Sequence, residues 1–116
     1  MLAAVPRWRH HTHGLQAATE AVDIRRRLAA ANPAAFEPDL AGSLNNLGAM
    51  LSDLGRREEA LTATTEAVDR YARLAPQAPA RFTEALHTAV TSLASQLDHL
   101  GRTDDAARAR SRINNL

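Results

Sequence analysis

The sequence contains no cysteine and no lysine, and only 3% of its 116 residues are aromatic. The lack of cysteine excludes disulfide bonds, thiolate catalysis and cysteine-ligated zinc. The scarcity of aromatic residues predicts a thin core in which leucine provides most of the buried area. All 14 basic residues are arginine, yet the formal net charge is only +1. No overall field therefore favours nucleic acid or an anionic membrane.

Long apolar runs are also missing. No run approaches the roughly 20 residues of a membrane-spanning helix. The first residues, MLAAVPRWRHHTHG, place a short apolar start before basic residues, which reverses the order of a secretory signal. We therefore expect no membrane partner and a cytoplasmic location.

What the sequence does contain is an internal repeat. The tetrapeptide EAVD occurs at 20–23 and again at 66–69, an offset of 46 residues. The same offset pairs Leu28 with Leu74, Phe36 with Phe82, Leu40 with Leu86, Leu47 with Leu93, Leu51 with Leu97, Gly55 with Gly101 and Ala60 with Ala106. Because one offset holds through apolar, turn and breaker positions, we interpret the chain as a stacked array of repeats.

Each unit of the array has the pattern of two helices. Leucines recur at steps of three and four residues over 40–54, which predicts a first helix. Pro38 suits the first turn of that helix, and Gly55 suits a left-handed residue after its end. A second helix is expected from about Arg57 to the residues before Pro76, since proline stops a helix.

The expected domain organisation follows from these units. Residues 15–31 form half a repeat, 37–75 one repeat and 80–115 another, within a helical repeat domain at 15–116. Residues 1–14 are expected to be a disordered segment or a degraded first helix. The predicted fold is all-α, an α-solenoid of antiparallel helix pairs with about two and a half repeats, five helices and no strands.

The segment SLNNLGAMLSDLGRREEALTATTEAV resembles a tetratricopeptide repeat. The signature positions of that family are occupied here by Leu44, Leu47, Gly48, Leu51, Gly55, Ala60 and Ala67. The next unit offers Val90, Leu93, Ala94, Leu97, Gly101 and Ala106, with Ile113 in place of the last alanine. The 46-residue period exceeds the usual period of about 34 residues, and is similar to the longer repeats of kinesin light chains and their bacterial relatives.

The resemblance implies a concave face, formed by the first helix of each pair, that binds a protein or peptide. Carried across by position, this face would show Asn45, Asn46, Ala49, Ser52, Asp53, Thr91, Ser92, Ser95, Asp98 and His99. Asparagine amides both donate to and accept from a peptide backbone, although the same residues could simply be solvated. Asn45 and Thr91 stand where a basic carboxylate clamp would need lysine or arginine, so we do not expect that clamp.

Other residues with chemical potential give weaker signals. His10, His11 and His13 are close in sequence, but no acid or cysteine nearby completes a metal site. Arg25–Arg27, with Arg7 and Arg9, could contact phosphates, but acids share that helix and the interleaved aromatics of a nucleic-acid surface are missing. We expect neither a metal site nor nucleic-acid binding.

Catalytic motifs are missing as well. The sequence contains no glycine-rich phosphate loop, G-x-S-x-G or H-E-x-x-H motif, and His87 and His99 have no nucleophile at a motif spacing. We therefore expect no enzymatic activity and no cofactor.

Two hypotheses for function remain open. The favoured one is a binding module, or scaffold, for a protein or peptide partner. The alternative is a structural element that forms a homo-oligomer through its repeat ends, or that is part of a larger bacterial regulatory protein. It arises because about three repeats are needed for a continuous core, and neither end carries a polar capping helix.

Overall fold

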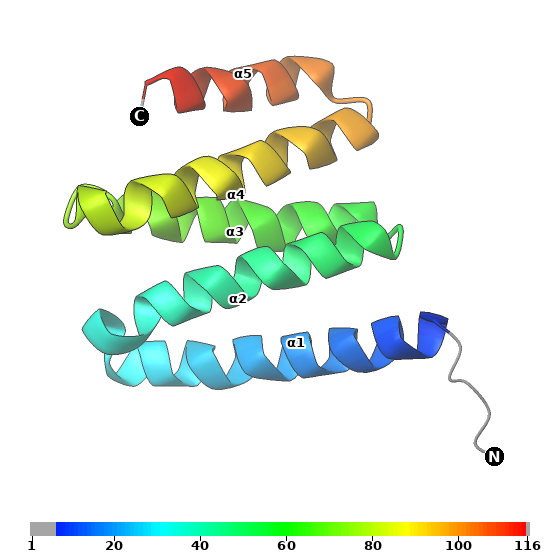
Figure 1. Cartoon of the computed structure of the whole chain (residues 1–116), viewed down its shortest axis with the longest axis horizontal. Helices are drawn as coiled ribbons and strands as arrows, with labels where there is room; N and C mark the ends of the chain where they lie inside the picture. Colours follow the sequence, from blue (N-terminus) through cyan, green and yellow to red (C-terminus); the bar gives the residue numbers. More distant parts are fainter. Residues whose placement is uncertain (1–6, 116) are drawn as a thin grey trace.

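The computed structural model describes residues 7–115, and their side chains from Gly14 onward. It contains five α-helices and, within that range, no strand. The helices are α1 (Arg7–Ala31), α2 (Pro33–Asp53), α3 (Arg57–Leu74), α4 (Pro79–His99) and α5 (Thr103–Asn114). Each helix packs against the next in the chain, and α2 also touches α4 (Figure 1). This arrangement confirms the predicted all-α solenoid of helix pairs.

Helix α2 begins at an earlier proline than predicted. Pro33 and Pro79 occupy the first turns of α2 and α4, where a missing N–H costs nothing. The Asn32 side chain accepts a hydrogen bond from the Ala35 amide at 3.4 Å and so caps α2. Pro38 lies inside the helix. The expected first-turn role of Pro38 was therefore wrong, because the Asn32–Pro33 pair supplies the start signals one turn earlier.

Glycine ends both first helices, as the sequence predicted. Gly55 has a φ of 77° and Gly101 a φ of 75°, in the left-handed region that glycine enters without a Cβ clash. In both turns the next amide reaches back across the glycine. The Arg56 N–H donates to the Leu51 carbonyl, and the Arg102 N–H to the Leu97 carbonyl, each at 2.9 Å. The two turns are therefore equivalent across the repeat.

The N-terminal helix is longer than expected. It begins at Arg7 rather than at Leu15, so its backbone includes much of the segment for which disorder or a degraded helix was predicted. Helix α1 packs on α2, and Val22 and Ala29 are buried against Leu40 and Leu44.

Helix α3 lies at the centre of the stack and buries two faces. Its Ala67 belongs to the apolar cluster between α1 and α2, whereas the neighbouring Val68 belongs to the cluster of α4 and α5. Both side chains are fully buried. Adjacent residues on one helix thus connect the two halves of the core.

Close contact between α2 and α3 depends on a glycine. A Cβ built on Gly48 would overlap the hydroxyl of Thr64 and would lie 3.3 Å from the Ala60 carbonyl oxygen. In the next unit Ala94 takes the place of Gly48, and Arg110 takes the place of Thr64. Arg110 is exposed and forms an ion pair with Asp98 of α4. This ion pair connects α5 to α4 through a contact that the repeat pattern did not indicate.

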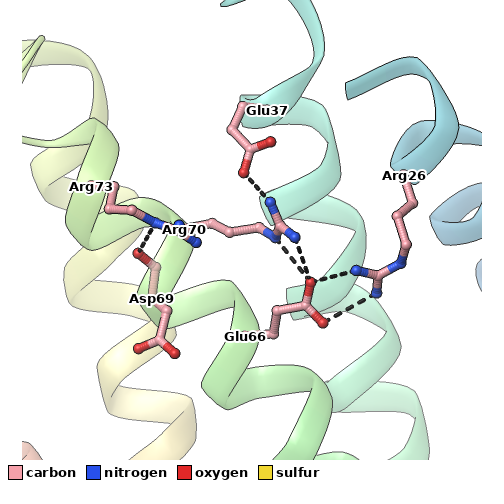
Figure 2. A network of polar contacts seen from close by, with 6 residues as sticks. All are labelled: Arg26, Glu37, Glu66, Asp69, Arg70 and Arg73. Atoms are coloured by element: carbon pink, nitrogen blue, oxygen red, sulfur yellow. Dashed lines mark hydrogen bonds and ion pairs between the residues drawn. The ribbon is translucent and has the colours of Figure 1, made fainter. Parts of the chain in front are cut away.

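A network of ion pairs joins α1, α2 and α3 (Figure 2). Arg26 of α1 donates to Glu66 of α3 at 2.7 Å, and Arg70 donates to the same carboxylate at 2.9 Å. Arg70 also pairs with Glu37 of α2. The hydrogen bond from Arg26, with further help from Arg70, lowers the pKa of Glu66 below its ordinary value. We call these four residues the ion-pair network.

We predict that Gly48→Ala destabilises the fold by about 2 kcal/mol, because overpacking outweighs the gain in helix propensity. Chemical denaturation of the variant measures the loss. The same substitution in a Thr64→Ala background should cost less than half as much, since the overlapping hydroxyl is then absent. An equal cost in both backgrounds would show that this contact does not limit the approach of the two helices.

The ion-pair network predicts a dependence of stability on pH. The folded state lowers the pKa of Glu66. The Glu66 carboxylate therefore stabilises the fold fully at pH values above its ordinary pKa, and this stabilisation is lost as the pH falls through the pKa of the folded state. Glu66→Gln should cost about 1 kcal/mol at pH 7 and should flatten the acid limb of the stability curve. Asp69→Asn, at an exposed site on the same helix, is the control. A Glu66→Gln curve parallel to that of the wild type would contradict the assignment.

Candidate functional site

A groove of about 320 Å³ lies between α2 and α4. Seven of the ten residues expected on the concave face line it: Ala49, Ser52, Asp53, Thr91, Ser92, Ser95 and His99. We call it the α2–α4 groove. It lies between the first helices of consecutive units, the location that the resemblance implied.

Helical spacing explains why these residues meet. Residues three or four apart share one face of a helix, so Ala49 lies beside Ser52 and Asp53 on α2, and Ser92 beside Ser95 and His99 on α4. The α2 and α4 faces approach because α3 spaces the two helices and packs against both. The repeat itself therefore builds the groove.

Three of the expected residues do not line the groove. Asn46 is exposed, and Asn45 is half-buried with its Oδ1 atom lacking a hydrogen-bond partner among the described residues. Asp98 pairs with Arg110 of α5. A basic residue on the following helix thus engages the Asp98 carboxylate, and the role of Asp98 in binding stays a prediction.

Gln96 also lines the groove, and the sequence analysis missed it. Only 6% of the residue is exposed, and its Oε1 atom is buried without a hydrogen-bond partner in the described part of the chain. An unsatisfied buried acceptor costs about 1–3 kcal/mol. The only sequence signal was a glutamine between Leu93 and Leu97, at the position equivalent to Met50 in the preceding unit.

The α2–α4 groove is neutral to acidic. Asp53 is the only residue of formal charge among those that line it. Arg57 lies near one end, where its guanidinium donates to the backbone carbonyl of His99 at 3.4 Å. An occupant rich in hydrogen-bond donors would match a carboxylate, several hydroxyls and an unsatisfied amide oxygen.

The other candidates are the histidines and the arginines of the N-terminal part of the chain. Among the described side chains, from Gly14 onward, no group of three could hold a metal ion. The side chains of His10, His11 and His13, and of Arg7 and Arg9, lie outside the described residues. In 25–27 each arginine contacts a protein group: Arg25 the Ser43 hydroxyl, Arg26 the Glu66 carboxylate and Arg27 the Asp23 carbonyl.

Among the described residues, no helix combines the length and the hydropathy that crossing a membrane requires.

The comparison with known families agrees with the repeat geometry. A family profile described as tetratricopeptide repeat matches residues 40–76, which run from Leu40 in α2 to just beyond the end of α3. Residues 40–76 are therefore similar to a tetratricopeptide repeat, a class of unit that generally mediates protein–protein interaction. No curated protein and no solved structure matches the chain.

Proposed function

We propose that the chain is a non-enzymatic binding module that holds an extended segment of a partner protein in the α2–α4 groove. One observation carries this proposal. Gln96 is buried beside the groove with an acceptor that no described residue satisfies, and a donor from a partner would satisfy it. The geometry thus favours the peptide-binding hypothesis over simple solvation of the polar face.

Each part of the groove has a role in this proposal. The terminal amide of Gln96 turns easily about its last bond, so its oxygen can meet a backbone N–H in the groove. The hydroxyls of Ser52, Ser92 and Ser95 both donate and accept. Asp53 would pair with a basic side chain of the segment.

We also propose a repeat subtype and a cellular location for this module. The offset of 46 residues supports a long-period tetratricopeptide array, similar to that of kinesin light chains and their bacterial relatives. We propose that the module works in the cytoplasm.

A second candidate function is assembly through the outer face of α1. Ile24 is 51% exposed and Leu28 40% exposed, and both line a hollow of about 370 Å³ beside Phe36 of α2. Large apolar side chains that share an exposed hollow are typical of an interaction surface. A second copy that covers α1 would bury them.

We predict that Gln96→Met separates stability from binding. Methionine keeps the length of the side chain but removes the acceptor, so the melting temperature of the free chain should rise. Peptides selected from a random display library on the immobilised chain should bind the variant about tenfold more weakly, by fluorescence anisotropy.

Gln77→Met, at an exposed site between α3 and α4, is the matched control and should bind like the wild type. Selected peptides that bind Gln96→Met and the wild type equally would refute the role of the α2–α4 groove.

The assembly hypothesis predicts a mass that depends on concentration. Sedimentation velocity from about 10 to 500 µM should show association of the wild type in the micromolar range, and Ile24→Glu should abolish it because a charge cannot be buried at the interface. Thr19→Glu, at another exposed site on α1, is the control. A monomer at every concentration would exclude assembly and leave the binding proposal intact.

A further inference from the structure

The array has two equivalent junctions: α1, α2 and α3 meet at the first, and α3, α4 and α5 meet at the second. The side chains at the two junctions differ. At the first junction, the ion-pair network joins Arg26, Glu37 and Glu66 across three helices. At an offset of 46 residues, the corresponding positions carry Ala72, Thr83 and Arg112. Leu116, the counterpart of Arg70, lies outside the described residues. The second junction therefore repeats the backbone arrangement of the first without the side chains that form the network.

The second junction is hollow. A groove of about 450 Å³ opens where α3, α4 and α5 meet. Ala72, Leu86 and Val90 give it an apolar floor, and Thr83, Arg112 and Asn115 contribute polar groups. We call it the α3–α5 groove. Leu86 and Val90 are buried, like their counterparts Leu40 and Leu44, so the accessible apolar surface of the groove belongs mainly to Ala72, Ala75 and Pro76.

The charge at this groove is opposite to that of the α2–α4 groove. No acidic residue lines it, and Arg112 has no ion-pair partner among the described residues. A neighbouring arginine on the same helix, Arg108, pairs with Asp105. The α3–α5 groove thus offers an apolar surface and one available cation.

We propose that the α3–α5 groove is a second binding site, and that it takes an internal segment of a partner protein in which a large aliphatic side chain stands next to an acidic one. The aliphatic side chain would lie over Leu86 and against Ala72, Ala75 and Pro76, whose apolar surface is still partly accessible and whose removal from water is favourable. The acidic side chain would pair with Arg112, as Glu37 and Glu66 pair with arginine at the first junction. The site is independent of the α2–α4 groove, because the two share no residue.

The test uses a blocked peptide, acetyl-Ser-Asp-Leu-Glu-Ser-amide, titrated into the isotope-labelled full chain. Nuclear magnetic resonance should show saturable shifts of the Leu86 and Val90 methyl groups and of the Arg112 side chain, with no change at the Ser92 and Ser95 amides. Blocked ends exclude capture of a terminal carboxylate. No saturable shift at these methyl groups overturns the proposal.

Two altered peptides separate the parts of the recognition. The Asn/Gln analogue of the peptide lacks charge and should bind about fivefold more weakly, the effect of losing one surface ion pair. Replacement of its leucine by alanine should weaken binding about tenfold. If either analogue binds as tightly as the original peptide, the side chain that it lacks is not recognised, and the proposed site is overturned.

Arg112→Gln should weaken binding of the original peptide about fivefold, whereas the matched control Arg108→Gln should leave it within twofold. Ala72→Arg combined with Thr83→Glu copies the side chains of the first junction into the second and should abolish binding. If this double variant fails to fold, the comparison of Arg112→Gln with Arg108→Gln decides whether the peptide binds at the α3–α5 groove. Equal binding by Arg112→Gln and the wild type overturns the proposal.

Removal of Leu116 tests whether the protein's own chain, rather than a partner, fills the α3–α5 groove. Unchanged peptide affinity after removal of Leu116 supports a site for a partner. Binding that occurs only after this removal would mean that the protein's own chain fills the groove, and would overturn the proposal.

Discussion

The close approach of neighbouring helices is the constraint on which the rest of the structure depends. With only 3% aromatic residues, the core cannot fill wide gaps, so helices must meet through glycine and alanine. Gly48 lies directly against Thr64, and Ala60 and Ala67 on the facing helix are fully buried. Dispersion contacts at such short range offset the small area that each alanine buries. Helix α3 can therefore hold both α2 and α4 in place.

Much of this arrangement could be predicted from the sequence, because it depends on local rules repeated at a fixed offset. Gly55 and Gly101 end their helices by backbone geometry alone, and the leucine spacing defines the buried faces. Most residues of the α2–α4 groove followed from the positions that the family resemblance implied. Because the pattern occurs twice in one chain, the interpretation of one unit can be checked against the other.

What the sequence could not predict depends on tertiary neighbours. Whether Asp98 faces the groove or Arg110 is decided by the position of α5, and whether Gln96 finds a partner is decided by the surrounding helices. The start of α2 was misplaced because Pro33 and Pro38 both fit the first turn of a helix, and only the Asn32 cap distinguishes them. The outcomes at Asp98 and Gln96 involve polar groups whose partners are set by contacts between helices, whereas the start of α2 is set by a local cap that the leucine spacing does not indicate.

The same distinction explains how one repeated backbone can carry different surfaces. The apolar positions that hold helix pairs together are nearly constant between the units, since a change there opens a cavity or an overlap. The polar positions are free to differ: Glu37 and Glu66 become Thr83 and Arg112 at the next junction. One junction is joined by ion pairs, and the other keeps an apolar floor with a cation beside it. Divergence at a few polar positions is thus sufficient to give the array grooves of opposite charge without altering the packing that builds them.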